Sequence, residues 1–253
     1  MKRLDKEIFD CVYADPDYNV GVNYNGKRYK RPFEEYIEWC SEWSREAHRL
    51  LKPTGNFFVV NYPRNNAYLW ANTLDELYHD VQEYVWVYNT NVGHSPKRFT
   101  TAHRSVLHCR KTNDNNWFKD HVAQPYKNPT DKRIRRNIAN GSKGRMPYSW
   151  LYYDLVKNVS REKTNHVCQI PQKLSELLFR ASTKKGDKVL VMFGGSGSEV
   201  LVAIRLGLDY TTFEIDPKYH KLILKRITRV EKAVREGELK PLTYYTEPLS
   251  QTQ

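Results

Sequence analysis

The 253-residue sequence lacks the long apolar segments and clustered cysteines that mark several large classes of protein. No run of about 18 apolar residues is present, so we expect no membrane-spanning helix. Residues 1–7 are mostly charged and lack the apolar core of a signal peptide. The four cysteines are scattered, without a Cys-x-x-Cys pair, which disfavours a zinc site or a disulfide framework. We therefore expect a cytoplasmic protein with reduced thiols and no bound metal.

The sequence also lacks the third glycine of a dinucleotide-binding loop. Residues 194–197 (Gly-Gly-Ser-Gly) follow a predicted strand, but Val200 stands where the third glycine would fall. This absence argues against NAD or FAD and favours a smaller nucleoside such as S-adenosylmethionine. The next predicted strand ends in residues 214–216 (Glu-Ile-Asp), whose carboxylates can accept the hydroxyls of a ribose. A tight strand-to-helix turn that binds no ligand is the alternative.

Positive charge is abundant and is concentrated in one segment. The formal net charge is +12, and residues 95–145 hold thirteen lysines and arginines against three aspartates. A concentrated basic block predicts a surface that binds a polyanion such as nucleic acid. A solvated basic face that supports solubility is the alternative.

A carboxylate, a proline and an aromatic ring occur together near the start of the chain. Asp15, Pro16 and Tyr18 follow the apolar run Phe9–Ala14, which we predict to be a buried strand. The Asp15 carboxylate and the Pro16 carbonyl can accept the two hydrogens of an exocyclic amino group, and Tyr18 can stack on a base that has left its helix. Taken alone, these residues are more typical of a plain Asp-Pro turn. The glycine loop downstream favours catalysis.

Apolar periodicity predicts strands that alternate with helices, which is typical of an α/β fold with a mixed, mostly parallel sheet. Residues 112–165 lack sustained periodicity and are rich in Asn, Lys, Arg, Gly and Pro, so we expect loops and short elements there. The predicted strands are Phe9–Ala14, 56–62, 84–88, 104–111, 188–193 and 210–215. The first predicted helix begins at Pro32 and is stopped by residues 52–55 (Lys-Pro-Thr-Gly). The other predicted helices cover 65–78, 173–182, Ser198–Leu206 and Pro217–Arg235.

Together, these motifs resemble the amino-group (adenine-N6 and cytosine-N4) DNA methyltransferases of the permuted type, in which the catalytic motif precedes the cofactor motif. Residues 15–21 (DPDYNVG) are similar to Asp-Pro-Pro-Tyr-Asn-x-Gly, and residues 193–198 (FGGSGS) are similar to Phe-x-Gly-Ser-Gly-Thr. Residues 213–219 (FEIDPKY) resemble Glu-Ile-Asp-x-x-Tyr, and residues 166–171 (HVCQIP) resemble His-Pro-Thr-Gln-Lys-Pro. Segments 49–55 and 98–103 also have family counterparts, so the resemblance extends from about residue 9 to 227.

The resemblance implies a Rossmann-like, S-adenosylmethionine-dependent methyltransferase fold with an inserted basic target-recognition region. Residues 1–111 would form the catalytic half of the methyltransferase domain, 112–165 the target-recognition insertion, and 166–253 the cofactor-binding half. The implied activity is transfer of a methyl group from S-adenosylmethionine to N6 of a flipped-out adenine in duplex DNA. The choice of adenine follows from Asp15, because the cytosine-N4 members more often carry serine at that position.

The resemblance also implies roles for individual residues. The implied catalytic residues are Asp15, Pro16 and Tyr18. The implied cofactor-binding residues are Gln169, Phe193, Gly194, Gly195, Ser196, Gly197, Ser198, Glu214 and Asp216. The implied DNA-binding residues, most of them facing phosphate, are Lys97, Arg98, His103, Lys132, Arg133, Arg135, Arg136, Lys143 and Arg145. Rings that could fill the gap left by a flipped base, although core packing is the favoured interpretation, are those of Trp117, Tyr126 and Tyr148.

The implied partner is double-stranded DNA, and a homodimer or a companion restriction or recognition subunit is left open. The sequence departs from the family pattern at several positions. Asp17 replaces the second proline, either as a turn former, which we favour, or as added negative charge. Residues 191–192 (Val-Met) replace the Asp-Pro before the glycine loop, and only three residues of segment 166–171 match. The strand that usually precedes the catalytic motif is missing, unless residues 242–246 supply it.

These departures support two alternative functions. One is a catalytically weak or inactive DNA-binding relative, or a subunit that depends on a partner. The other is a methyltransferase that acts on cytosine N4 or on RNA.

Overall fold

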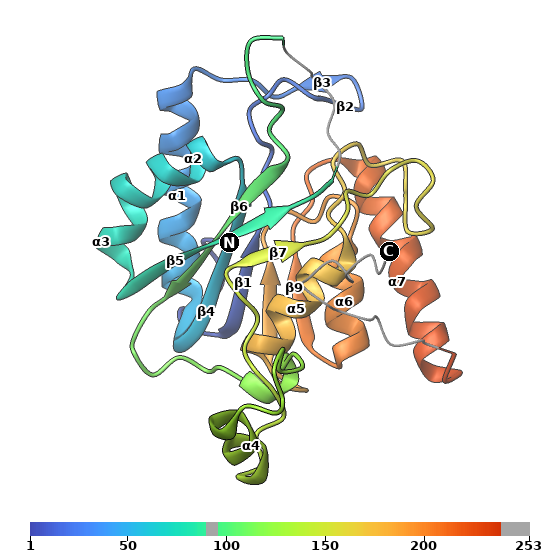
Figure 1. Ribbon diagram of the computed structural model, residues 1–253. Helices are drawn as coiled ribbons and strands as arrows, with labels where there is room; N and C mark the ends of the chain where they lie inside the picture. Colours follow the sequence, from blue (N-terminus) through green and yellow to red (C-terminus); the bar gives the residue numbers. More distant parts are fainter. Residues whose placement is uncertain (90–95, 239–253) are drawn as a thin grey trace.

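The computed structural model describes residues 1–89 and 96–238, which contain one large mixed sheet flanked by helices (Figure 1). The strands of the sheet are β1 (Phe9–Ala14), β4 (Leu51–Asn61), β5 (Asp80–Val87), β6 (His103–Arg110), β7 (Trp150–Tyr152), β8 (Lys188–Val191) and β9 (Asp209–Thr212). A separate small hairpin joins β2 (Asn23–Tyr24) and β3 (Lys27–Arg28). The helices are α1 (Phe33–Leu50), α2 (Pro63–Leu69), α3 (Asp75–Leu77), α4 (Lys132–Ala139), α5 (Gln172–Ser182), α6 (Ser198–Leu206) and α7 (Pro217–Arg235), with a π-helical turn over Trp70–Leu74 and a 3-10 turn over Lys119–His121.

The strand order is β7-β5-β6-β4-β1-β8-β9, with β1 near the middle. β1 is parallel to both β4 and β8, β8 is parallel to β9, and β5 is parallel to β7, while β6 is antiparallel to β4 and β5. The expected α/β fold with a mixed, mostly parallel sheet is therefore confirmed. Since β1, β4, β8 and β9 point the same way, the loops that follow them meet at one edge of the sheet.

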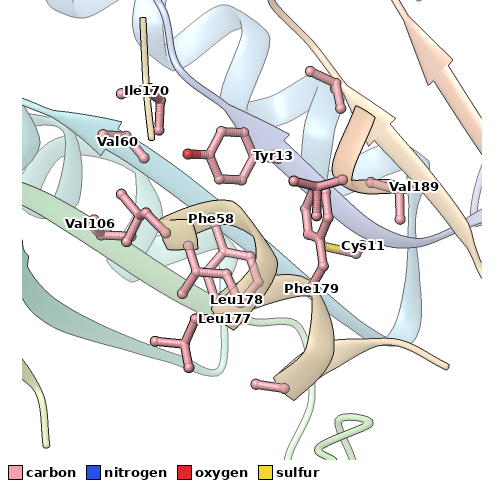
Figure 2. Packing of buried hydrophobic residues seen from close by; sticks show 14 of the residues in the cluster. Cys11, Tyr13, Phe58, Val60, Val106, Ile170, Leu177, Leu178, Phe179 and Val189 are labelled. Carbon is pink, nitrogen blue, oxygen red and sulfur yellow. The ribbon is translucent and has the colours of Figure 1, made fainter. Parts of the chain in front are cut away.

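Helices cover both faces of the sheet, and β1 alternates between them. Tyr13 and Cys11 face α5, where Tyr13 meets Phe179 edge-on with ring centroids 5.7 Å apart. Figure 2 shows Tyr13, Cys11 and Phe58 beside Leu178 and Phe179. Val12 and Ala14 face the other way and pack with α1. Burial on both faces fixes β1, and with it the position of the loop that begins at Asp15.

Several predicted boundaries are confirmed, and a few are wrong. β1, α6 and α7 have the predicted limits. α1 ends at Leu50, before the predicted stop at residues 52–55, but β4 starts at Leu51, earlier than the predicted residue 56. The pairing of β1 with β4 passes from Phe9↔Leu51 to Cys11↔Asn56, which shows that the extra residues are absorbed in a bulge. β8 and β9 end earlier than predicted because residues 192–193 and 213–215 leave the ladder to line a cavity.

The segment 112–165 consists of loops and short elements, as predicted. Its first part is anchored at the edge of the sheet opposite the β1 loop, because Asn116 N donates to Thr54 O and Phe118 N donates to Ala181 O, at the end of α5. α4 projects from this end of the molecule, far from the β2–β3 hairpin (Figure 1). The segment then returns along the sheet through β7, which pairs with β5.

Two features that the sequence does not predict are a membrane-spanning helix and a metal site. Within residues 1–89 and 96–238, no helix combines the length and apolar character needed to cross a membrane. The same part of the chain contains no group of three His, Cys, Asp or Glu side chains arranged to hold a metal ion. The segment 242–246, considered as a source of an extra strand, lies outside the described residues.

Candidate active site

A cavity of about 540 Å³ lies at the edge of the sheet where β1, β8 and β9 end. More than half of its lining residues come from three segments that are far apart in the sequence: residues 15–18 after β1, 192–196 after β8 and 213–216 after β9. Most of the residues predicted to act in catalysis or in cofactor binding therefore surround one space. Its volume lies in the range of small-molecule and cofactor sites.

Asp15 and Tyr18 are joined at the end of this cavity that lies next to β1. Tyr18 Oη donates a 2.6 Å hydrogen bond to Asp15 Oδ1. Burial and the nearby Glu199 carboxylate raise the pKa of Asp15 well above its usual value, while the Tyr18 hydrogen bond and the Arg104 charge oppose that rise. Burial therefore favours the neutral Asp15 carboxyl, and a cation entering the cavity would favour its ionised form.

The ring of Tyr18 belongs to a small aromatic cluster. It meets Tyr62 edge-on, with ring centroids 5.4 Å apart, and its side chain is largely buried. The Arg104 guanidinium lies 3.9 Å from the centroid of the Tyr62 ring and 5.4 Å from that of Tyr18. These contacts hold the Tyr18 ring beside the cavity and place a positive charge next to it.

Asp17 forms a turn and is also paired with a cation. Asn19 N donates to Asp17 Oδ1 at 3.1 Å, and Arg31 Nη1 lies 3.5 Å from Asp17 Oδ2. The Tyr36 hydroxyl donates to the Asp17 carbonyl at 2.6 Å. Burial raises the pKa of Asp17, and the Asn19 and Arg31 contacts offset part of that rise. Asp17 thus acts as a turn former, as favoured from the sequence. Its carboxylate also lines the cavity, and Arg31 balances its negative charge.

The glycine loop fits closely against neighbouring segments. Gly195 has a φ of +51°, and a Cβ atom there would lie 3.2 Å from His166 Nε2. Gly197 has a φ of +79° and caps the start of α6, where a Cβ atom would lie 3.2 Å from Ile223 Cγ1. Both positions therefore favour glycine for conformation and for space. Phe193, Gly194, Gly195 and Ser196 line the cavity, whereas Gly197 and Ser198 lie just behind it.

The two acids after β9 are held by backbone N–H groups. Gly195 N donates to Glu214 Oε2 at 2.7 Å, and Asp216 N donates to Glu214 Oε1 at 2.7 Å. Each carboxylate oxygen has a second lone pair, so Glu214 can also accept ribose hydroxyls. Asp216 Oδ1 accepts from the N–H groups of Lys218 and Tyr219 and caps α7. Glu214 is therefore the better-placed ribose acceptor of the two.

The β2–β3 hairpin reaches across the cavity from the catalytic side. Its tip residue Asn25 donates from Nδ2 to Asp216 Oδ2 at 3.2 Å. Tyr24 contacts the rings of Tyr29 and His166, and all three line the cavity. Burial works against ionisation of Asp216, but its hydrogen bonds from Asn25 and from the start of α7 leave its pKa below the usual value. The hairpin thus ties the catalytic half of the cavity to the β9 end.

Gln169 does not line the cavity. Its Oε1 accepts from Thr164 N and Oγ1, and its Nε2 donates to Glu162 O, so it closes the loop before α5. That loop presents His166, Cys168 and Ile170 to the cavity. Burial lowers the pKa of His166 to about 4, so its ring is neutral near pH 7.

The sequence prediction missed several cavity residues, of which Glu199 is the most consequential. Its side chain lies in the first turn of α6 and lines the cavity, with only 4% of the residue exposed. Burial raises its pKa to about 7, and a hydrogen bond from Ser175 opposes the rise. An acid directly after the glycine loop was a readable signal. Trp39, in α1, gave no such signal, because its contact with the cavity depends on packing of α1 beside Phe193.

The predicted DNA-binding residues fall into two groups at opposite ends of the sheet. Lys97 and Arg98 are exposed and His103 is half-buried, at the end of β6 that lies nearest the catalytic loop. The other group lies on and around α4, at the far end (Figure 1). In α4 the Asp131 side chain accepts from the N–H groups of Arg133 and Ile134, and Arg133 is exposed. The structure therefore does not bring all the predicted cations to one surface.

Several residues considered from the sequence for contact with DNA make contacts within the protein. Arg145 lies over the Tyr148 ring, 4.5 Å from its centroid, and its backbone pairs with Gln124. Trp117 stacks on His108 with centroids 4.9 Å apart, and Tyr126 Oη is hydrogen-bonded to Ser142 Oγ. Trp117 packs against the core cluster, as the favoured interpretation expects, whereas Tyr148 is exposed and is not a core residue.

Comparison with known proteins finds relatives that match most of this chain. Residues 9–225 fit the N6_N4_Mtase family model, described as DNA methylase. The DNA adenine methyltransferase YhdJ of Escherichia coli (strain K12) is 27% identical over 232 residues, which cover 90% of this chain and 79% of that protein. The type II methyltransferase M.HpaI of Haemophilus parainfluenzae is 25% identical over 229 residues, which cover 90% of this chain and 70% of that protein.

Solved structures share the fold. The cytosine-N4-specific PvuII DNA methyltransferase superposes with a TM-score of 0.66 and 19% identity, over 94% of this chain and 89% of that chain. A complex of M1.HpyAVI with SAM superposes with a TM-score of 0.60 and 20% identity, over 88% and 89% of the two chains.

Proposed function

The chain belongs to the N6_N4_Mtase family of DNA methylases, and we propose that it transfers a methyl group from S-adenosylmethionine to the N6 amino group of an adenine in double-stranded DNA. One observation supports this most strongly: the Asp15 loop, the glycine loop and the acids after β9 line a single cavity. Residues 1–111 and 166–253 then act as the catalytic and cofactor-binding halves, and residues 112–165 as the target-recognition insertion. The protein would act as a cytoplasmic, DNA-associated enzyme.

The cavity suits S-adenosylmethionine on physical grounds. Glu214 offers free lone pairs on a carboxylate that two N–H groups hold in place. Phe193, Phe213 and Tyr219 supply apolar and aromatic walls, which suit a flat adenine ring. The glycine loop presents backbone rather than side chain to the same space. The proposed nucleoside end of the cavity is therefore the one nearest β9.

The proposed chemistry needs two acceptors and a close approach. The cofactor supplies a methyl group made electrophilic by a positively charged sulfonium. Asp15 and the Pro16 carbonyl would hold the two hydrogens of the target amino group, so that the nitrogen lone pair points toward that methyl group. Asp15 would also meet the positive charge that grows on the nitrogen. Its raised pKa suits it to accept the proton that the methylated nitrogen then releases.

Adenine is proposed as the target because Asp15 occupies the first position of the catalytic motif and because the relative YhdJ is named as a DNA adenine methyltransferase. The PvuII methyltransferase of similar fold is named as cytosine-N4-specific. Identification of the methylated nucleoside distinguishes the two targets.

The DNA is proposed to contact both basic groups. Lys97, Arg98 and His103 would hold phosphates close to the target base, because β6 begins beside the catalytic loop. The arginines of α4 would contact phosphates farther along the duplex, at the other end of the sheet. Phosphate contacts of this kind fix register and orientation without reading sequence.

The proposal is tested by expressing the chain in a host that lacks DNA methylation and sequencing the genome for modified bases. The wild-type protein should produce N6-methyladenine at one recurrent sequence, and Asp15→Asn should abolish it. Asp209→Asn is the matched control, because Asp209 is exposed at the start of β9, away from the cavity, and should leave methylation unchanged. N4-methylcytosine would correct the target base. Equal methylation by the wild-type and Asp15→Asn proteins would overturn the catalytic assignment.

A further inference from the structure

Glu199 is a buried carboxylate that faces the cavity, with the Arg226 charge near it but not in an ion pair with it. It is 4% exposed, and Ser175 Oγ donates to its Oε1 at a long 3.3 Å. No ion pair joins it to a Lys, Arg or His within residues 1–89 and 96–238. Buried carboxylates are normally paired or well hydrogen-bonded, because an isolated buried charge is costly. By contrast, Glu176, also buried, pairs with Arg180 at 2.8 Å.

The position of Glu199 within the cavity restricts what it could meet. A trivalent sulfonium carries three arms: a methyl group, a nucleoside and an amino-acid tail. Three parts of the cavity lining bear on these arms: the Asp15 loop, the β9 end with Glu214, and the glycine loop and start of α6 with Ser196 and Glu199. If the methyl faces Asp15 and the nucleoside faces Glu214, the tail is left for the third part.

We propose that the Glu199 carboxylate binds the α-ammonium group of the cofactor's amino-acid tail. This inference rests on the proposed function, and it assigns a specificity role to a residue outside the recognised motifs. It also accounts for a departure from the family pattern, since the acid that usually precedes the glycine loop is replaced by Val191. Glu199 follows the same loop and returns a carboxylate to the cavity from α6 instead of from β8.

The charges around Glu199 make this binding sensitive to pH. Tyr13 and Asp15 face it from β1 and its following loop, Arg226 lies on the α7 side, and Glu162 lies on the loop before α5. Burial raises the pKa of Glu199 to about 7, with Ser175 and Arg226 opposing the rise and Glu162 adding to it. A bound ammonium would favour ionised Glu199, so binding near pH 6 should release a proton.

The test measures binding rather than methylation. Purified full-length protein is titrated calorimetrically with S-adenosylmethionine and with two analogues. S-adenosylhomocysteine has the tail ammonium but no sulfonium, and 5′-methylthioadenosine has neither. Glu199→Gln keeps the side-chain shape and removes the charge. It should weaken S-adenosylhomocysteine binding about 10- to 100-fold, the range for a charged hydrogen bond, and change methylthioadenosine binding less than about twofold. Glu176→Gln, a buried acid outside the cavity, should leave both affinities unchanged.

The outcomes separate this inference from the proposed function. Binding by the wild-type protein tests the proposed function, because a chain that binds neither ligand nor S-adenosylmethionine does not use this cofactor. The effect of Glu199→Gln on the affinity for S-adenosylhomocysteine, compared with its effect on the affinity for 5′-methylthioadenosine, tests the ammonium contact. Equal weakening of both ligands by Glu199→Gln, or no weakening of either, would overturn the ammonium contact. Weakening of S-adenosylmethionine alone would also overturn it, since Glu199 would then face the sulfonium.

Discussion

Tyr18 Oη donates a 2.6 Å hydrogen bond to Asp15 Oδ1 within the loop that follows β1. The bond links the residue proposed to hold the target amino group with the ring proposed to stack on the target base. The bond favours the ionised form of Asp15, so it lowers the pKa of this carboxyl, whereas burial raises that pKa. The acid and the aromatic ring of the catalytic motif are thus coupled through protonation as well as position.

Tyr18→Phe tests this coupling through the pH dependence of methylation. The variant keeps the ring and removes the hydroxyl, so the pKa of Asp15 should rise further above that of the wild-type protein. Because Asp15 must be ionised to accept the amino hydrogens, the acid limb of the kcat/KM profile should move to higher pH. An unchanged acid limb in a folded Tyr18→Phe protein would show that Asp15 ionisation does not govern the reaction.

Glu199 should make the free protein less stable as pH rises. Its pKa is about 7 in the folded protein against an ordinary value of 4.5, so the folded state binds more protons between these limits. Protonated Glu199 therefore contributes to the free energy of unfolding. This contribution, at most about 3 kcal/mol, is fully present below about pH 4.5 and is lost as pH rises through 7. Urea unfolding at pH 5 to 8 should show a flatter pH dependence in Glu199→Gln. Identical profiles in the two proteins would contradict the raised pKa.

Gly195→Ala should damage cofactor binding as well as stability. Both the positive φ and the 3.2 Å approach to His166 Nε2 disfavour a methyl group at this position. We expect a loss of about 1–3 kcal/mol in the free energy of unfolding, together with weaker S-adenosylmethionine binding. Gly141→Ala is the control, because Gly141 also has a positive φ of +87° but open space around it. The control should lose stability alone, and equal cofactor affinity in both variants would remove the glycine loop from the binding site.

The basic residues of α4 should contribute to the salt dependence of DNA binding. Replacing Arg133, Arg135 and Arg136 together by glutamine should reduce the slope of log K against log salt by about 2.7 if each contacts one phosphate. A Lys97→Gln, Arg98→Gln double variant should reduce it by about 1.8. Fluorescence anisotropy with a duplex at several salt concentrations measures both slopes. An unchanged slope in the α4 variant would limit the DNA contact to the catalytic end.

The sequence alone predicted the elements whose signals are local. β1, α6 and α7 were delimited correctly because an apolar run, a glycine turn and an Asp-Pro start mark their ends. The family model confirms the resemblance that these motifs carried. The Asp15 and glycine loops could be predicted to meet because parallel strands bring their carboxyl ends to one edge.

Other features depend on contacts between distant segments and could not be predicted in this way. Residues 52–55 stop the helix, as predicted, but the sequence does not show that they continue as part of β4, in the irregular stretch between Leu51 and Asn56. The basic residues 95–145 form one block in sequence, yet β6 and the anchoring of residues 112–124 send its two parts to opposite ends of the sheet. The sequence places Glu199 directly after the glycine loop, but its burial beside Ser175 and its contact with the cavity depend on packing between α5 and α6.

The most direct test of the account is methyl transfer by purified protein. Wild-type and Asp15→Ala proteins are incubated with methyl-labelled S-adenosylmethionine and mixed-sequence duplex DNA, and the DNA is then digested to nucleosides for mass analysis. The account predicts labelled N6-methyladenine with the wild-type protein and none with Asp15→Ala. Absence of any labelled nucleoside with a wild-type protein that binds both the cofactor and DNA would contradict the proposed activity.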